Sequence, residues 1–153
     1  MELPLCELLD SNEPAIRYKT LTGIYGFPES HPEVKISHET IRTCEKVKAI
    51  LAHRNQKGQI DTHPYKKWQG AFWTISILAE LGYPAGDTSL IPLCEQVLNW
   101  LLSPSHDKYI RIINGRVRIC ASMEGNAILS LLKLGLADDR VDQLANRLVE
   151  WHA

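Results

Sequence analysis

Two groups of residues carry side chains that could bind or transform a small molecule. The first group is His63, Tyr65, Lys67 and Trp68, at the expected start of an apolar helix, with Trp73 one turn further on. If such helices line a cavity, the positive end of the helix dipole and the lysine favour an anionic head group, with an apolar tail among the rings. A solvated helix start with one tryptophan packed into the core explains the same residues without a ligand.

The second group is Arg118, Cys120, Glu124 and Asn126, around the expected start of another apolar helix. These residues could form a polar cluster facing the same cavity, with Glu124 as a general acid and Cys120 as a nucleophile. In a purely structural role, Glu124 would stabilise the helix N-terminus, Asn126 would bond to a loop, and Cys120 would be buried and inert. The sequence does not show the environment that either catalytic role needs. We therefore assign no catalytic residue and treat all of these side chains as candidate ligand contacts.

Other chemistries have less support. The six histidines are scattered and the four cysteines form no Cys-x-x-Cys pair, so we expect neither a metal site nor a cofactor. A net charge of −1 argues against a nucleic-acid partner. A helix over 89–103 followed by an arginine-bearing hairpin resembles a winged-helix DNA binder. That helix, however, carries no lysine or arginine to neutralise phosphates.

The chain length and the composition of the N-terminus limit which classes of protein this can be. A chain of 153 residues is long enough to bury the core of a single domain, which we place at 1–153. No run of about 18 apolar residues is present, so we expect no membrane span. The first ten residues have no basic stretch or cleavage site, and the scattered cysteines fit reduced thiols. The expectation is a soluble, cytoplasmic protein.

The elements that must position the candidate residues are mostly helical. Apolar residues between Trp68 and Leu81 cover nearly the whole circumference of a helix, which predicts a helix buried on all sides. Pro64 marks its earliest start and Gly82 its end. The stretch 109–120 alternates β-branched residues with arginines around Asn114-Gly115 and predicts a small β-hairpin with a type I′ turn.

The chain also repeats itself. Leu81-Gly82 matches Leu134-Gly135, and Gly26-Phe27-Pro28 matches Gly82-Tyr83-Pro84. The period of roughly 50 to 56 residues predicts one helical hairpin per repeat, at about 12–54, 64–103 and 121–152. Each repeat pairs a more buried first helix with a more amphipathic second one. We expect an all-α fold of stacked helical hairpins, with the first helices facing the interior of a curved stack.

Several segments resemble a known superfamily. They are the Gly-[Phe/Tyr]-Pro motifs, the loop RNQKGQI before HPYKKWQGAFW, and the string CASMEGNAILSLLKLGLADD. Over residues 12–151 the chain is similar to bacterial members of the terpenoid-cyclase and protein-prenyltransferase α/α-toroid superfamily, and most of all to its squalene-cyclase-like branch. The resemblance implies a partial toroid with half the hairpins of a complete ring, and an apolar or isoprenoid-like ligand.

The functional motifs of that superfamily differ here. The cyclases use an Asp-x-Asp-Asp acid, whereas the adjacent pair Asp138-Asp139 sits at a helix start, where capping explains it. The prenyltransferases bind zinc through Asp, Cys and His, but Arg118-Ile119-Cys120 stands where Asp-x-Cys would be needed. Of the repeat Gln-x-x-x-Gly-x-Trp, only Arg54, Gly58 and Ile60 correspond. We therefore expect a helical-repeat scaffold or apolar-ligand-binding module. The alternative is an isoprenoid-processing enzyme that needs more chain or a partner.

The last helix suggests self-association. Repeat stacks need polar terminal caps, yet this helix carries Leu144, Leu148, Val149 and Trp151 at an unpaired end. A monomer would leave part of that surface exposed to water. The sequence therefore predicts a homodimer through the C-terminal hairpin.

Overall fold

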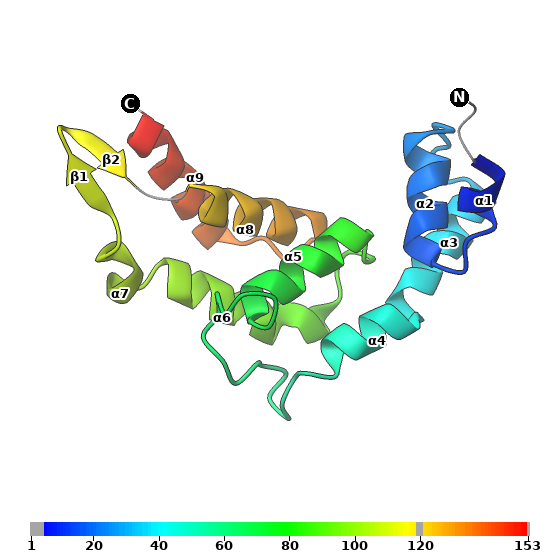
Figure 1. Cartoon of the computed structure of the whole chain (residues 1–153), viewed down its shortest axis with the longest axis horizontal. Coiled ribbons are helices and arrows are strands. Elements are labelled where there is room, and N and C mark those ends of the chain that lie inside the picture. The colour runs from blue at the N-terminus through cyan, green and yellow to red at the C-terminus, as the bar shows by residue number, and fades with distance from the viewer. Residues whose placement is uncertain (1–4, 119–120, 153) are drawn as a thin grey trace.

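A computed structural model describes residues 5–118 and 121–152 and shows an all-α fold with one small β-hairpin (Figure 1). In chain order the elements are α1 (Leu5–Leu9), α2 (Pro14–Gly23), α3 (Pro32–Thr43), α4 (Glu45–Leu51), α5 (Ala71–Leu81), the 3₁₀ turn η1 (Thr88–Leu90), α6 (Ile91–Leu101), α7 (Pro104–Asp107), β1 (Arg111–Ile113), β2 (Arg116–Arg118), α8 (Ser122–Lys133) and α9 (Asp139–His152). The predicted all-α class is confirmed.

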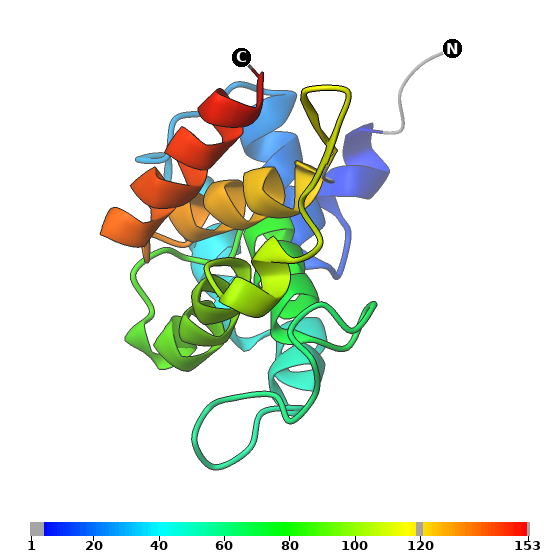
Figure 2. The ribbon, with the colours of Figure 1, turned by 90° about the vertical axis from the view of Figure 1, so that its left-hand side faces the viewer.

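Helix α5 is the centre of the packing. It contacts α4, α6 and α8, while α9 packs on α8, and α1 to α3 pack on one another at the far end of the molecule (Figure 1). Viewed from the hairpin end, the pair α8–α9 lies on the pair α5–α6 (Figure 2). Phe72, Ile75 and Leu78 of α5 are buried together with apolar residues of α6, α8 and α9. The prediction of a central helix is confirmed, but α5 is not buried on all sides, because Glu80 is exposed and Trp73, Ser76 and Ile77 are only partly buried.

Helices α5 and α8 end in the same way. Gly82 and Gly135 both have left-handed backbone, with φ of 77° and 64°. The next amide reaches back in each case: Tyr83 N–H donates to the Leu78 carbonyl and Leu136 N–H to the Leu131 carbonyl, each at 3.0 Å. This Schellman closure satisfies carbonyls that have no partner within the helix. Gly82 and Gly135, which occupy equivalent positions in the sequence repeat, therefore end their helices with the same backbone geometry.

The start of α5 differs from the prediction. The helix begins at Ala71, and neither Pro64 nor Trp68 is helical. Gly70 is the N-cap residue, and a Cβ at this position would lie 2.2 Å from the Pro64 carbonyl oxygen. Trp68 itself has a positive φ of 63°, which a helix does not allow. The segment before α5 therefore folds back over the start of the helix.

The hairpin and one helix break follow local signals. Asn114 and Gly115 both have positive φ, of 53° and 73°, as a type I′ turn requires. The strands pair antiparallel with Arg111 opposite Arg118 and Ile113 opposite Arg116. The helical segment between Pro32 and Leu51 is divided at Cys44, whose backbone is extended. Its division into α3 and α4 follows from that single non-helical residue.

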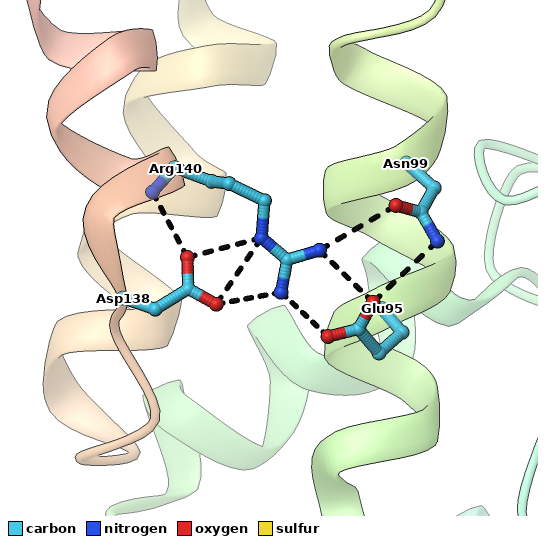
Figure 3. A network of polar contacts seen from close by, with 4 residues as sticks. All are labelled: Glu95, Asn99, Asp138 and Arg140. Atoms are coloured by element: carbon cyan, nitrogen blue, oxygen red, sulfur yellow. Dashed lines mark hydrogen bonds and ion pairs between the residues drawn. The ribbon is translucent and has the colours of Figure 1, made fainter.

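The acidic pair before α9 has a structural role. Asp138 accepts a hydrogen bond from the Arg140 amide at 2.9 Å and pairs with the Arg140 guanidinium at 2.6 Å (Figure 3). The same guanidinium binds both carboxylate oxygens of Glu95 on α6, at 2.5 and 2.9 Å, and contacts Asn99. These bonds join α6 to α9. Capping of the last helix by Asp138 is confirmed.

The surface predicted for dimerisation is smaller than expected. Leu144 is fully buried in the core, so grouping it with an uncovered end was wrong. Leu148 is half-buried, and Val149 is exposed. The side chain of Trp151 lies outside the described residues. Because α9 is amphipathic and packs on α8, its inward positions are used within the chain.

Candidate functional site

The first predicted group lies in the turn before α5 and forms part of an aromatic cluster. Tyr65 packs against Phe72, Trp73 and Trp100, with ring centroids 5.2, 5.7 and 5.6 Å apart. Trp68 packs on Trp73 at 4.4 Å. Such spacings are typical of favourable aromatic contacts. The fold thus brings three of the predicted residues together, Tyr65, Trp68 and Trp73, with Phe72 of α5 and Trp100 of α6 as additions that the sequence analysis did not include.

His63 and Lys67 lie at the edge of this cluster. The His63 ring meets Trp100 edge-on at 5.4 Å, and the Lys67 ammonium lies 5.6 Å from the Trp68 ring in a cation–π contact. The α5 N-terminus is covered by chain, because the Phe72 amide donates to the Pro64 carbonyl at 3.0 Å. An anion would have to displace this carbonyl to reach that amide. The geometry favours apolar over anionic contacts here.

A cavity of about 620 Å³ lies beside Trp68, between α4, α5 and the loop that joins them. Half of the lining residues are aliphatic or aromatic and half are polar: Ala49, Ile50, Ile60, Trp68 and Ile77 on the one hand, and His53, Asp61, Thr62, Gln69 and Thr74 on the other. The Trp68 side chain is 64 % exposed although its ring rests on Trp73. A bulky residue with left-handed backbone and an exposed ring at a cavity is a strained arrangement of the kind found at binding sites.

The loop that forms one wall is held firmly to α6. The Gln96 side chain accepts from the Ile60 amide at 2.9 Å and donates to the Ile60 carbonyl at 2.8 Å. Arg54 donates to the Ser89 carbonyl at 3.0 Å, and Gly58 lies against Pro92. Arg54, Gly58 and Ile60 thus all anchor the loop. The cavity is therefore largely preformed.

Two buried donors near the cavity have no hydrogen-bond partner among the described residues. They are the Thr62 hydroxyl, which belongs to a wall residue, and the Trp73 indole N–H, whose ring packs on Trp68. Unsatisfied buried polar groups are uncommon in folded proteins and call for an explanation. Both atoms are shielded from solvent, so neighbouring side chains would have to move before a partner could reach them.

No family model, curated protein or solved structure matches this chain.

The second predicted group does not assemble as expected. Glu124 is fully buried in the first turn of α8, where its Oε1 lies 3.0 Å from Nε2 of His106, a residue of α7 that is 2 % exposed. Asn126 is exposed and does not join this pair. Cys120 and the side chain of Arg118 lie outside the described residues. The partner of Glu124 is thus a histidine that the sequence analysis missed.

The buried pair adjoins the aromatic cluster rather than the cavity. The His106 ring meets Trp100 edge-on at 4.9 Å. The second carboxylate oxygen of Glu124 has no hydrogen-bond partner among the described residues. Neither side chain lines the cavity, so the role of the pair is to support Trp100 within the aromatic cluster. The only sequence signal for His106 is Ser103, whose hydroxyl caps the short helix α7 that carries it.

Other reactive groups are poorly placed for chemistry. Burial raises the pKa of the Cys94 thiol to about 12, so it stays protonated and is a weak nucleophile at neutral pH. Across residues 5–118 and 121–152, no three His, Cys, Asp or Glu side chains gather as a metal ion would require. In the same part of the chain, no helix has the length and apolar character needed to cross a bilayer.

Proposed function

We propose that this chain is a helical-repeat module that binds an apolar, isoprenoid-like small molecule in the cavity beside Trp68. The observation that carries the proposal is an exposed tryptophan, held in left-handed backbone, at a cavity of about 620 Å³. Small-molecule sites commonly measure roughly 300 to 1,000 Å³ and are lined mainly by apolar and aromatic side chains. The resemblance to isoprenoid-binding proteins points to the same ligand class.

The chemistry of the walls specifies the ligand further. Ile50, Ile60 and Ile77 offer a branched aliphatic surface that suits a flexible hydrocarbon body. The polar wall residues His53, Asp61 and Gln69 favour a single oxygen at one end of the ligand, which could hydrogen-bond to them. Lys67 already contacts the Trp68 ring, and no arginine lines the cavity. We therefore favour a neutral alcohol or ketone over a diphosphate ester.

A binding titration tests the proposal. Farnesol, a neutral isoprenoid alcohol, would be titrated into the full chain by calorimetry. We expect Trp68→Ala to weaken binding about tenfold, since one aromatic contact contributes about 1 kcal/mol and Trp68 also closes the cavity. Ile77→Trp should narrow the cavity and weaken binding, because its larger ring occupies part of the space next to Trp68 and Thr74. Tyr109→Ala is the matched control because Tyr109 is an exposed aromatic residue on the chain before β1. Equal affinity in all four proteins would refute the proposal.

One observation favours an enzymatic function as the second candidate. His53 and Asp61 both line the cavity, so an imidazole and a carboxylate could act on a bound ligand. The Asp61 carboxylate already accepts a hydrogen bond from Asn55 at 2.6 Å, which orients it. Incubation with farnesyl diphosphate or squalene, followed by mass spectrometry of the extract, tests this alternative. Product formed by the wild-type chain and lost in Asp61→Asn would replace the binding module with an enzyme.

A further inference from the structure

The β-hairpin leaves apolar side chains uncovered at one end of the molecule. β1 and β2 extend beyond the helices at the end opposite α1 to α3 (Figure 1), and the hairpin packs mainly on itself. Tyr109 and Ile112 are each 74 % exposed, and Ile113 is also exposed. The chain covers these side chains only in part, so the hairpin leaves apolar area in contact with water.

The same segment concentrates positive charge. From residue 108 to residue 123 the chain contains Lys108, Arg111, Arg116 and Arg118 and no aspartate or glutamate. All eighteen acidic residues and thirteen of the seventeen lysines and arginines lie elsewhere, so the rest of the chain is acidic. Among the described residues, neither Lys108 nor Arg111 forms an ion pair, whereas the neighbouring Asp107 is paired with Arg147. The hairpin is thus a basic projection on an otherwise acidic protein.

We infer that this hairpin is a docking element for an anionic phospholipid surface, with Ile112 and Ile113 entering the boundary between head groups and acyl chains. Peripheral attachment strengthens with the apolar area that enters the bilayer and with the attraction between basic residues and anionic lipids. The hairpin provides both contributions in one short unit. Tyr109, two residues before β1, is the kind of side chain enriched at the membrane–water interface.

The combination of charges and isoleucines selects the partner. Nucleic acids would use the cations but offer no apolar phase for the exposed isoleucines. A second copy of this chain would bring two basic hairpins together, and like charges at such an interface repel. An anionic bilayer satisfies both features. The acidic remainder of the chain would turn the hairpin toward such a surface as the protein approaches.

Vesicle sedimentation of the full chain tests this inference. We expect co-sedimentation with phosphatidylcholine vesicles that contain phosphatidylglycerol, and none with phosphatidylcholine alone. Arg111→Gln should lower the partition coefficient about fivefold, since one basic residue near an anionic leaflet contributes about 1 kcal/mol. The double variant I112S/I113S should lower it at least about tenfold through lost apolar contact. Ile36→Ser is the matched control, because Ile36 is 67 % exposed on α3 at the other end of the molecule.

Different results would contradict membrane docking or assign the hairpin to another partner. Circular dichroism and thermal melting should be unchanged in these variants, because the hairpin packs mainly on itself. The inference would be overturned if a folded I112S/I113S protein sedimented with the vesicles like the wild type. It would also be overturned if the wild-type protein bound neutral and anionic vesicles equally, or bound neither. Retention of duplex DNA that depends on Arg111 but not on the isoleucines would assign the hairpin to nucleic acid. A dimer in the absence of vesicles, lost in I112S/I113S, would assign it to a second copy.

Discussion

Removing the His106 side chain should destabilise the protein more than any exposed substitution. His106 is 2 % exposed and Glu124 is fully buried, with 3.0 Å between Nε2 and Oε1. In His106→Ala, the Glu124 carboxyl group would lose its recorded hydrogen-bond partner while remaining in the core. Breaking such a buried pair by deleting one partner costs about 3 to 5 kcal/mol. We expect His106→Ala to lower the free energy of unfolding by about 3 kcal/mol, at the lower end of this range, because water can enter the space that the deleted imidazole leaves.

Two further variants separate the lost pair from a simple loss of volume. Glu124→Gln keeps a hydrogen-bonding group opposite His106 and should cost about 1 kcal/mol. The double variant H106F/E124L replaces the pair with apolar side chains of similar size and keeps a ring against Trp100. Since apolar replacement of a buried pair is often neutral or stabilising, it should recover most of the stability lost in His106→Ala.

Urea unfolding followed by circular dichroism gives the free energies of unfolding. A domain of this size is typically stable by about 5 to 15 kcal/mol, so a loss of about 3 kcal/mol is well resolved. His63→Ala is the matched control, because His63 contacts the same Trp100 ring from an exposed position. It should change the stability by about 1 kcal/mol at most, because it loses only an exposed hydrogen bond from the Tyr65 amide and one ring contact. The reasoning fails if His106→Ala costs as little as this control, or if H106F/E124L is less stable than His106→Ala.

Three further predictions follow from single contacts. Gly70→Ala places a Cβ 2.2 Å from the Pro64 carbonyl oxygen, so the turn that carries Trp68 must move. We expect the free energy of unfolding, measured in urea, to fall by more than about 2 kcal/mol, and farnesol to bind more weakly. Hydrogen bonds from Arg140 hold the pKa values of Glu95 and Asp138 below their ordinary values of 4.5 and 3.8. Their ionised forms therefore stabilise the native state above these values, and stability is lost as the pH falls through the lowered pKa values. Arg140→Gln should reduce this loss, as measured by urea unfolding across that acid range. If the chain dimerises through its C-terminal hairpin, Val149→Glu should convert the dimer to a monomer in light scattering, whereas an unchanged mass would exclude that interface.

Much of the fold could be predicted because its signals are local. The all-round apolar pattern of α5 predicted burial, and Gly82 predicted the left-handed helix end. Asn114-Gly115 predicted the hairpin turn, since few other dipeptides accept positive φ at both positions. Each of these features depends on side chains within a few residues of one another.

The candidate site depends on contacts between distant segments, and here prediction was weaker. The backbone of Trp68 is non-helical because Gly70 lets the chain pass close to the Pro64 carbonyl, a contact that no apolar periodicity encodes. The His106–Glu124 pair joins residues eighteen positions apart on two different helices. The cavity wall at Ile60 exists because Gln96 of α6 binds its backbone. A hydrophobicity pattern carries no information about such pairings.

The central claim is that an apolar ligand occupies the cavity beside Trp68. The most direct measurement is a methyl NMR titration of isoleucine-labelled protein with farnesol. We predict that Ile50, Ile60 and Ile77, which line the cavity, will shift progressively and saturate, while the exposed Ile36 and Ile112 will not move. Unchanged cavity methyls, or the largest shifts at Ile36 and Ile112, would contradict the account.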